Sequence, residues 1–144
     1  MKHSRQKIRE AVAANLAGIA TVYTSRIYPK LTLPVISVYG NNEQSEGEAT
    51  EAVGPQRYSR RLTLEIEITA EATEGADDAV DDLSAQVEAA MAADRWLGGL
   101  AEETGLAATR MSFANAGDTQ VATAPLSYLV WYRTHASDPE NPIT

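Results

Sequence analysis

The alternation of apolar and polar residues is clearest between residues 61 and 73, "RRLTLEIEITAEA". Side chains at every second position of a strand share one face of a sheet. Five apolar residues occupy one such face here, while threonines and carboxylates occupy the other. The pattern predicts a strand over about residues 57–72 whose exposed face is lined by Glu65, Glu67 and Glu71.

Two other stretches follow the 3.6-residue period of an amphipathic helix. The first is expected to start at Ser4 as the N-cap and to run to about Ala17, where Gly18 can end it. The second is expected from about Ala76 to Ala93, with aspartates in its first two turns, where the helix dipole favours negative charge.

Shorter extended stretches are indicated by β-branched and aromatic residues. They cover residues 21–28, 35–39, 107–114 and 121–134. The last two are separated by "NAGD", a sequence typical of a turn. Both faces of the last stretch are apolar, which indicates a central strand or one that meets a partner subunit.

Residues 40–56, "GNNEQSEGEATEAVGPQ", contain four glutamates, three glycines and a proline, and almost no apolar side chain. Such a composition predicts a long, mobile acidic loop, because it offers little surface to bury. Residues 135–144, "HASDPENPIT", are expected to form a polar C-terminal tail. The carboxylates of this loop, which we consider for contacts with a neighbouring subunit or another partner protein, are Glu43, Glu46, Glu48 and Glu51.

Three arginines follow this acidic loop directly. Arg57 and Arg61 share a face of the predicted strand, and Arg60 points to the other face. They are either partners for carboxylates of a neighbouring chain or charges that keep a strand edge from aggregating.

The order of these elements predicts an α+β fold. We expect a two-layer arrangement in which two helices pack on one face of a mostly antiparallel sheet of four to five strands. A chain of 144 residues is long enough for one core without disulfides or metals. Residues 1–144 are therefore expected to form a single domain.

The formal net charge of −8 disfavours general nucleic-acid binding, which needs clustered Lys and Arg. The signs are also unevenly distributed. Residues 1–39 carry a net charge of +5, whereas residues 62–103 carry twelve acids and one base. Either this polarity makes a two-signed molecule, or folding mixes the signs on one surface.

The sequence contains few residues of the types that usually form catalytic or metal-binding sites. The chain has no cysteine, and its two histidines lie near its ends. Motifs for a serine nucleophile, a phosphate loop or a zinc protease are absent from the sequence. We therefore expect no enzymatic activity, no metal and no cofactor, and no apolar run has the length of a membrane span. A carboxylate-based enzyme and a regulatory binding domain remain as alternatives.

Taken in order, several pieces resemble the phage tail terminator family, the minor tail protein U type of long non-contractile tails. They are "RQKIREAVAANLAG", "LPVISVY", "RYSRRLTLEIEITAEA", "DDAVDDLSAQVEAAM" and "APLSYLVWYRT". The resemblance covers about residues 5–134 and concerns order and character, not a catalytic signature. A related tail-completion or neck family shares much of this plan.

The resemblance implies a non-enzymatic virion protein, made in the cytoplasm of a bacterial host. Proteins of that family form a ring of six on the head-proximal end of the tail tube, where they stop tube polymerisation and meet the head-completion protein. DNA passes through such a ring. The row of Glu65, Glu67 and Glu71 is therefore expected either to face the channel and repel phosphate or to be an ordinary solvated face of the sheet. The alternatives to the terminator role are a head–tail neck or connector protein and a protein-binding domain outside the virion.

Overall fold

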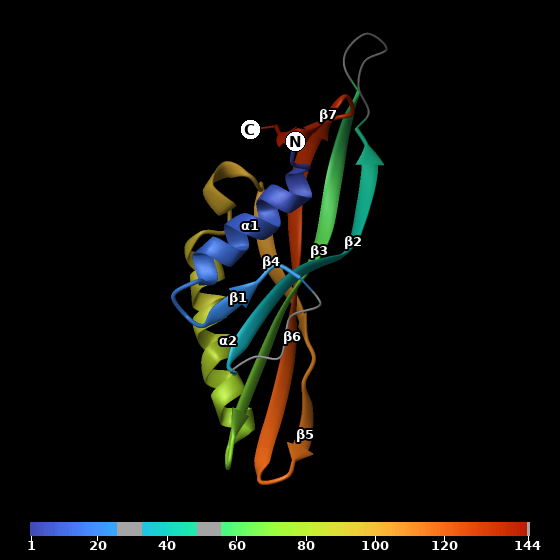
Figure 1. Cartoon of the computed structure of the whole chain (residues 1–144). Helices are drawn as coiled ribbons and strands as arrows, with labels where there is room; N and C mark the ends of the chain where they lie inside the picture. The colour runs from blue at the N-terminus through green and yellow to red at the C-terminus, as the bar shows by residue number, and fades with distance from the viewer. Residues whose placement is uncertain (26–32, 49–55, 144) are drawn as a thin grey trace.

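The computed structural model of the protein describes residues 1–25, 33–48 and 56–143. In these residues two α-helices, α1 (Ser4–Leu16) and α2 (Ala76–Ala93), lie on one face of a curled sheet (Figure 1). A short 3-10 helix, η1 (Leu97–Gly99), follows α2. The strands are β1 (Thr21–Tyr23), β2 (Val35–Gly47), β3 (Arg57–Ala72), β4 (Glu103–Thr109), β5 (Ser112–Ala116), β6 (Thr119–His135) and β7 (Asp138–Pro142).

The α+β class and the helical layer agree with the prediction, but the sheet is larger than expected. Its described residues form seven strands instead of four or five, in the order β1-β2-β3-β6-β4, and both β5 and β7 also pair with β6. β1 is parallel to β2, and the other pairs are antiparallel. β3 pairs with β6 along its whole length, from Arg57 opposite His135 to Ala72 opposite Gln120.

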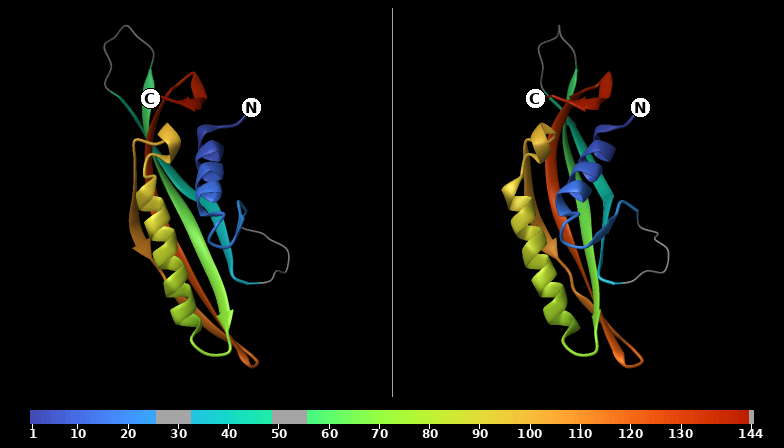
Figure 2. Two further views of the ribbon diagram at one scale, coloured as in Figure 1. Left: turned by 90° about the vertical axis from the view of Figure 1, so that its left-hand side faces the viewer. Right: turned by 60° about the vertical axis from the view of Figure 1, so that its left-hand side comes forward.

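The core lies between the sheet and the two helices. α1 contributes Ile8, Val12 and Leu16, which follow the predicted stripe. Each of these side chains is fully buried, which stabilises the fold by about 1.5–3 kcal/mol per side chain. Figure 2 shows the helices side by side, with α1 on the side of β2 and α2 on the side of β4. The helix-facing residues of β3 are those of the predicted apolar face, namely Leu62, Leu64, Ile66, Ile68 and Ala70.

The prediction of a loop from residue 40 onward is wrong for its first half. Residues 40–47 continue β2 and pair with β3, with Glu43 opposite Leu62 and Gly47 opposite Tyr58. Pairing with a long neighbouring strand satisfies the backbone groups, so these polar residues need no apolar alternation to be extended. Residues 49–55, which include Glu51, lie outside the described residues.

The prediction of a polar tail is also wrong, since Asp138–Pro142 forms β7 against β6. The start of α1 packs against this strand. Ser4 is buried, and its hydroxyl donates to the carbonyl oxygen of Pro139 at 2.7 Å. The N-cap of α1 is His3 and not Ser4, because Nδ1 of His3 accepts from the backbone N–H of Arg5 at 3.0 Å.

Two further strand predictions change in extent. β1 ends at Tyr23, and residues 26–28 of its predicted stretch lie outside the described residues. The stretch predicted at residues 107–114 is divided between β4 and β5. β5 and β6 meet at the predicted "NAGD" turn, where Gly117 has a φ of 65°, a left-handed conformation that glycine adopts without strain.

Candidate functional site

A bulge in β2 decides which way its acidic residues point. The register with β3 shifts between Gly40 and Asn42. One extra residue in a strand turns the positions after it to the opposite face. Val38, before the bulge, pairs with Ile66 on the helix side, and Glu43, after the bulge, pairs with Leu62 on that same side. The bulge therefore turns Glu43 under α1.

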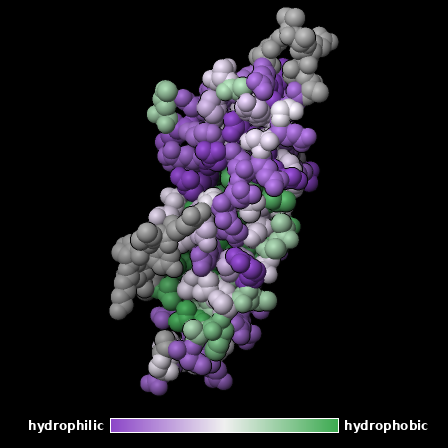
Figure 3. Space-filling model, turned by 90° about the vertical axis from the view of Figure 1, so that its right-hand side faces the viewer, coloured by the Kyte–Doolittle hydropathy of each residue, from purple (hydrophilic) through white to green (hydrophobic). Residues whose placement is uncertain are grey.

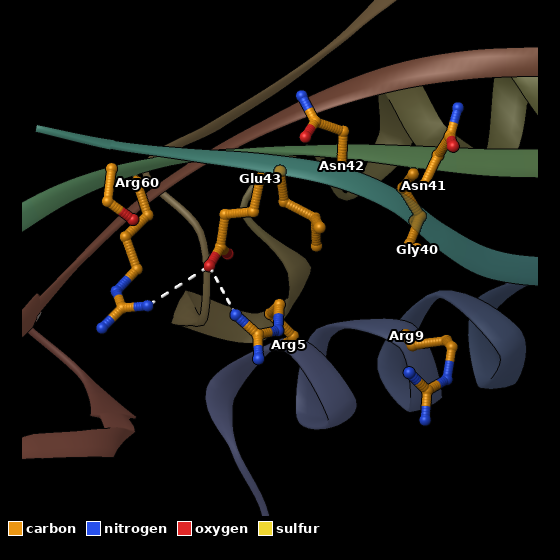
Figure 4. Close-up of a pocket in the computed structure, with 10 residues that line it drawn as sticks. Arg5, Arg9, Gly40, Asn41, Asn42, Glu43 and Arg60 are labelled. Atoms are coloured by element: carbon orange, nitrogen blue, oxygen red, sulfur yellow. Dashed lines mark hydrogen bonds and ion pairs between the residues drawn. The ribbon is translucent and has the colours of Figure 1, made fainter.

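Glu43 holds two arginines from distant parts of the chain (Figure 4). Its Oε2 accepts from Nη1 of Arg5 at 2.7 Å and from Nη1 of Arg60 at 3.2 Å. Its Oε1 accepts a hydrogen bond from the hydroxyl of Tyr132. Nε of Arg60 donates to Oγ1 of Thr134 at 3.0 Å. The side chains of Glu43 and Arg60 are only 9% and 10% exposed, so this is a buried, hydrogen-bonded ion pair.

Burial, together with the charges of Glu43, Arg5 and Arg60, shifts the pKa values of Tyr132 and His3. Burial raises the pKa of Tyr132, and the hydrogen bond to Glu43 raises it further, so the hydroxyl remains a donor. Burial, followed by the charges of Arg5 and Arg60, lowers the pKa of His3 below its usual 6.5. A neutral His3 keeps Nδ1 available as the acceptor that caps α1.

An open groove of about 570 Å³ lies between α1 and the bulged part of β2. Besides the cluster it is lined by Arg9, Asn41 and Asn42, with Leu62 and Leu64 also on its wall. Nε of Arg9 is buried and has no hydrogen-bond partner among the described residues. Three arginines against one glutamate make the groove positive in an acidic protein, so it suits carboxylate oxygens.

Several of the other candidate residues form hydrogen bonds or ion pairs within the subunit. Nη2 of Arg61 donates to Oε1 of Gln44 at 2.6 Å, and Oε1 of Glu48 lies 3.5 Å from Nη1 of Arg133. A hydrogen bond from Arg133 to Glu102 raises the pKa of Arg133. Arg57 and Arg61 do face away from Arg60, as predicted.

The remaining candidates are more accessible, since Glu46 is exposed and Arg57 is half-buried. Sequence reasoning missed Arg5, Arg9, Tyr132 and Thr134. No local pattern links these residues to Glu43, because their proximity comes from sheet pairing and from the position of α1.

Within the described residues, no group of three or more His, Cys, Asp or Glu side chains is placed to hold a metal ion. None of the helices described combines the length and hydrophobicity that a membrane span requires.

The predicted row of exposed carboxylates is wrong at Glu65, which is 3% exposed. Its carboxylate accepts from the hydroxyl of Ser127 on β6 at 2.8 Å and from Nδ2 of Asn41 on β2 at 3.3 Å. Polar side chains of the two flanking strands therefore cover and satisfy it. Glu67 is half-buried and accepts from the Tyr39 hydroxyl at 3.2 Å, and Glu71 is exposed.

Replacing Glu65 by alanine is expected to lower the free energy of unfolding by about 1–2 kcal/mol, because the hydroxyl of Ser127 loses its buried acceptor. Glu71→Ala, on the same strand face, is the matched control and should change it by less than about 0.5 kcal/mol. Urea unfolding followed by circular dichroism measures both values. Equal effects of the two substitutions would contradict the structural role of Glu65.

The outer face of the sheet, opposite the helices, is divided in character (Figure 3). Hydrophilic residues dominate its upper half, and hydrophobic residues gather in its lower half, towards the β5–β6 hairpin. Half-buried apolar side chains of β6 on this face include Val121, Pro125 and Leu129. This face therefore offers surfaces of different chemistry at its two ends.

No family model matches the sequence, and no curated protein matches it significantly. Among solved structures, the chain is similar to a chain in the virion of a native gene transfer agent particle, with a TM-score of 0.39 and 17% identity over 90% of this chain and 92% of that one. It is also similar to the sheath/tube terminator, in the extended state, of an extracellular contractile injection system, PVC. There the TM-score is 0.49 and the identity 13%, over 96% of this chain and 60% of that one. Because both TM-scores lie below 0.5, the function proposed next rests on the residues and surfaces of this chain.

Proposed function

We propose that this chain is a structural virion protein that caps the head-proximal end of a phage-type tail tube. Six copies form a ring, end the polymerisation of the tube and present a surface to the head-completion protein. The resemblance of residues 5–134 to tail terminators motivates this role. The chemistry is that of assembly, with no catalytic step and no cofactor.

The observation that carries the proposal is the separation of charge in the helical layer. The segment with α1 holds four basic residues, Lys2, Arg5, Lys7 and Arg9, against one acid, Glu10. In contrast, α2 holds five acids and no base, and all five are exposed. Those five are Asp77, Asp78, Asp81, Asp82 and Glu88.

A closed ring of identical subunits uses heterologous contacts, which require two different and complementary surfaces on each subunit. The two helices lie side by side on one face of the sheet (Figure 2), so the helical layer is basic at α1 and acidic at α2. The basic α1 of one copy can face the acidic α2 of the next all around a ring. Charges placed in this way steer association and fix its direction.

Two further surfaces, the end of the sheet with β7 and its outer face, are proposed to contact other components of the particle. Glu46, Arg57 and Arg61, at the end of the sheet with β7, are proposed to contact the tube or the head-completion protein. The outer face of the sheet is proposed to line the channel for DNA, with Glu67 and Glu71 as its negative charges. Glu65 has no part in this, because it is buried.

Light scattering across a wide range of protein concentrations tests the ring. We expect a species with about six times the mass of the 15.5 kDa subunit, which electron microscopy should show as a ring. The amount of this species should fall at high salt, because salt screens exposed ion pairs. Tube protein polymerised with this chain should give shorter tubes than tube protein alone. A monomer at every concentration, together with unchanged tube lengths, would overturn the proposal.

A further inference from the structure

We infer that neighbouring copies join by strand pairing, the outer edge of β4 in one copy adding to residues 41–47 of β2 in the next. The sheet then continues from subunit to subunit. This inference rests on the ring of the proposed function and identifies the surface that closes it. The partner of both edges is a second copy of this chain.

The first edge is open, although a bulge between Leu106 and Ala108 interrupts the pairing of β4 with β6. Within the described part of the chain, β4 pairs with β6 alone, so its other side carries unpaired backbone groups. Residues 104–109 include no charged residue and no proline, and residues 106–109 are exposed. Sheet edges in soluble proteins are usually protected by lysine, proline or a covering segment. Leu106 is 42% exposed.

The second edge lies on the opposite side of the sheet. β1 pairs only with the first residues of β2, from Val35 to Ser37. No other described strand pairs with residues 41–47 on that side, and most of these residues are exposed. The segment has as many residues as β4, which spans Glu103–Thr109. Each copy therefore has two different open edges of matching length, which is the requirement of a heterologous contact.

The two edges also lie in the same rows of paired residues. Following the pairs across the sheet, one row contains Gly105, Leu129, Thr63 and Asn42, and a second row two positions away contains Glu103, Trp131, Arg61 and Gln44. A closed ring relates its copies by rotation alone, so edges that meet must share a height along the axis. With the strands along that axis, β4 meets the open part of β2 without a vertical shift.

The strand directions fit as well. β4 is antiparallel to β6, β6 to β3, and β3 to β2, so β4 and β2 run in opposite directions. Rotation about an axis along the strands keeps these directions. The two edges therefore meet as an antiparallel pair, the pairing with straight hydrogen bonds between strands.

The charges of the two helices also favour a contact between β4 of one copy and β2 of the next. α2 packs on β3 and β6, on the side of β4, and α1 packs beside β2 (Figure 2). Joining β4 to β2 of the next copy brings the acidic α2 towards the groove between β2 and α1. Arg9 lines that groove. A carboxylate of the neighbouring α2 would pair with its guanidinium through a charge-assisted hydrogen bond.

Cysteine cross-linking tests the pairing, because the chain has no cysteine of its own. Asn42→Cys and Gly105→Cys lie in one row but on opposite edges, so within a subunit they are separated by β3 and β6. A Cβ at Gly105 would lie 3.8 Å from the ring of Trp131, an ordinary contact. With a short bis-maleimide, the double variant is expected to give a ladder of covalent oligomers up to six copies. Each single variant should give monomers only.

Several results would overturn the inference. One is the absence of a ladder from the double variant, and another is a dimer from either single variant, since only a two-fold contact brings identical edges together. Leu106→Lys gives a second readout and should abolish rings while keeping the circular dichroism spectrum. Met111→Lys, an exposed apolar residue outside β4, is the matched control and should keep the rings.

Two results would separate the contact between sheet edges from the capping of the tube. Rings that persist in Leu106→Lys and never cross-link between the two edges would refute the edge contact and leave the capping role intact. A full ladder with unchanged tube lengths would support the contact and refute capping.

Discussion

Glu43→Ala is expected to lower the free energy of unfolding by about 3–5 kcal/mol, because it leaves a buried arginine without its counter-charge. The side chain of Arg60 is 10% exposed, and its Nη1 donates to Glu43. Its remaining bond, from Nε to Thr134, does not neutralise the charge. The buried hydroxyl of Tyr132 loses its acceptor in the same variant. Urea unfolding at neutral pH, followed by far-ultraviolet circular dichroism, measures the change.

The same strand supplies the control for this experiment. Glu46→Ala removes an exposed carboxylate three residues further along β2 and should change the free energy of unfolding by less than about 0.5 kcal/mol. Removing both charges in Glu43→Ala/Arg60→Met is expected to cost less than Glu43→Ala alone, because no buried charge is then left unpaired. Equal stability of Glu43→Ala and the wild type would contradict the buried ion pair.

The second large effect concerns assembly and comes from reversing the charges of the helical layer. Lys7→Glu/Arg9→Glu makes α1 acidic, and Asp81→Lys/Asp82→Lys makes that part of α2 basic. In a ring that joins α1 of one copy to α2 of the next, each double variant places like charges at every contact. Like charges across an interface cost several kcal/mol, so either variant should be monomeric by light scattering.

Two rescues make this prediction specific. The quadruple variant reverses both surfaces, so opposite signs face each other again and rings are expected to return. An equimolar mixture of the two double variants should also form rings, with the variants alternating, because each then meets its opposite charge. Rings in both double variants would show that these helices do not carry the contact, and a monomeric quadruple variant would show that their charges are not its cause.

Much of the fold follows from local pattern. α2 begins at Ala76 and ends at Ala93, and β3 covers Arg57–Ala72, as the periodicity predicts. Both elements carry a continuous apolar face, so the burial of that face and the local repeat favour the same conformation. The separation of acidic and basic segments was also visible in the sequence, and the structure keeps it because each segment forms a different helix.

The polar strands could not be predicted in this way. Residues 40–47 have the composition of a loop, yet they are extended because β3 lies beside them and satisfies their backbone groups. β7 forms against β6 for the same reason. In both cases the cause is a neighbouring strand far away in the sequence.

The candidate site depends on the tertiary structure still more strongly. A single bulge in β2 turns Glu43 from the outer face to the helix side, where Arg5 and Arg60 meet it. Glu65 fits the alternation of an exposed carboxylate, but Ser127 and Asn41 of the flanking strands bury it. The sequence by itself thus determined which segments are helical or apolar on one face and where charge accumulates, since these depend on residues close in the chain. Which charges are buried, which of them pair and which sheet edges stay open was decided by the pairing of distant strands, because only that pairing sets the surroundings of each side chain.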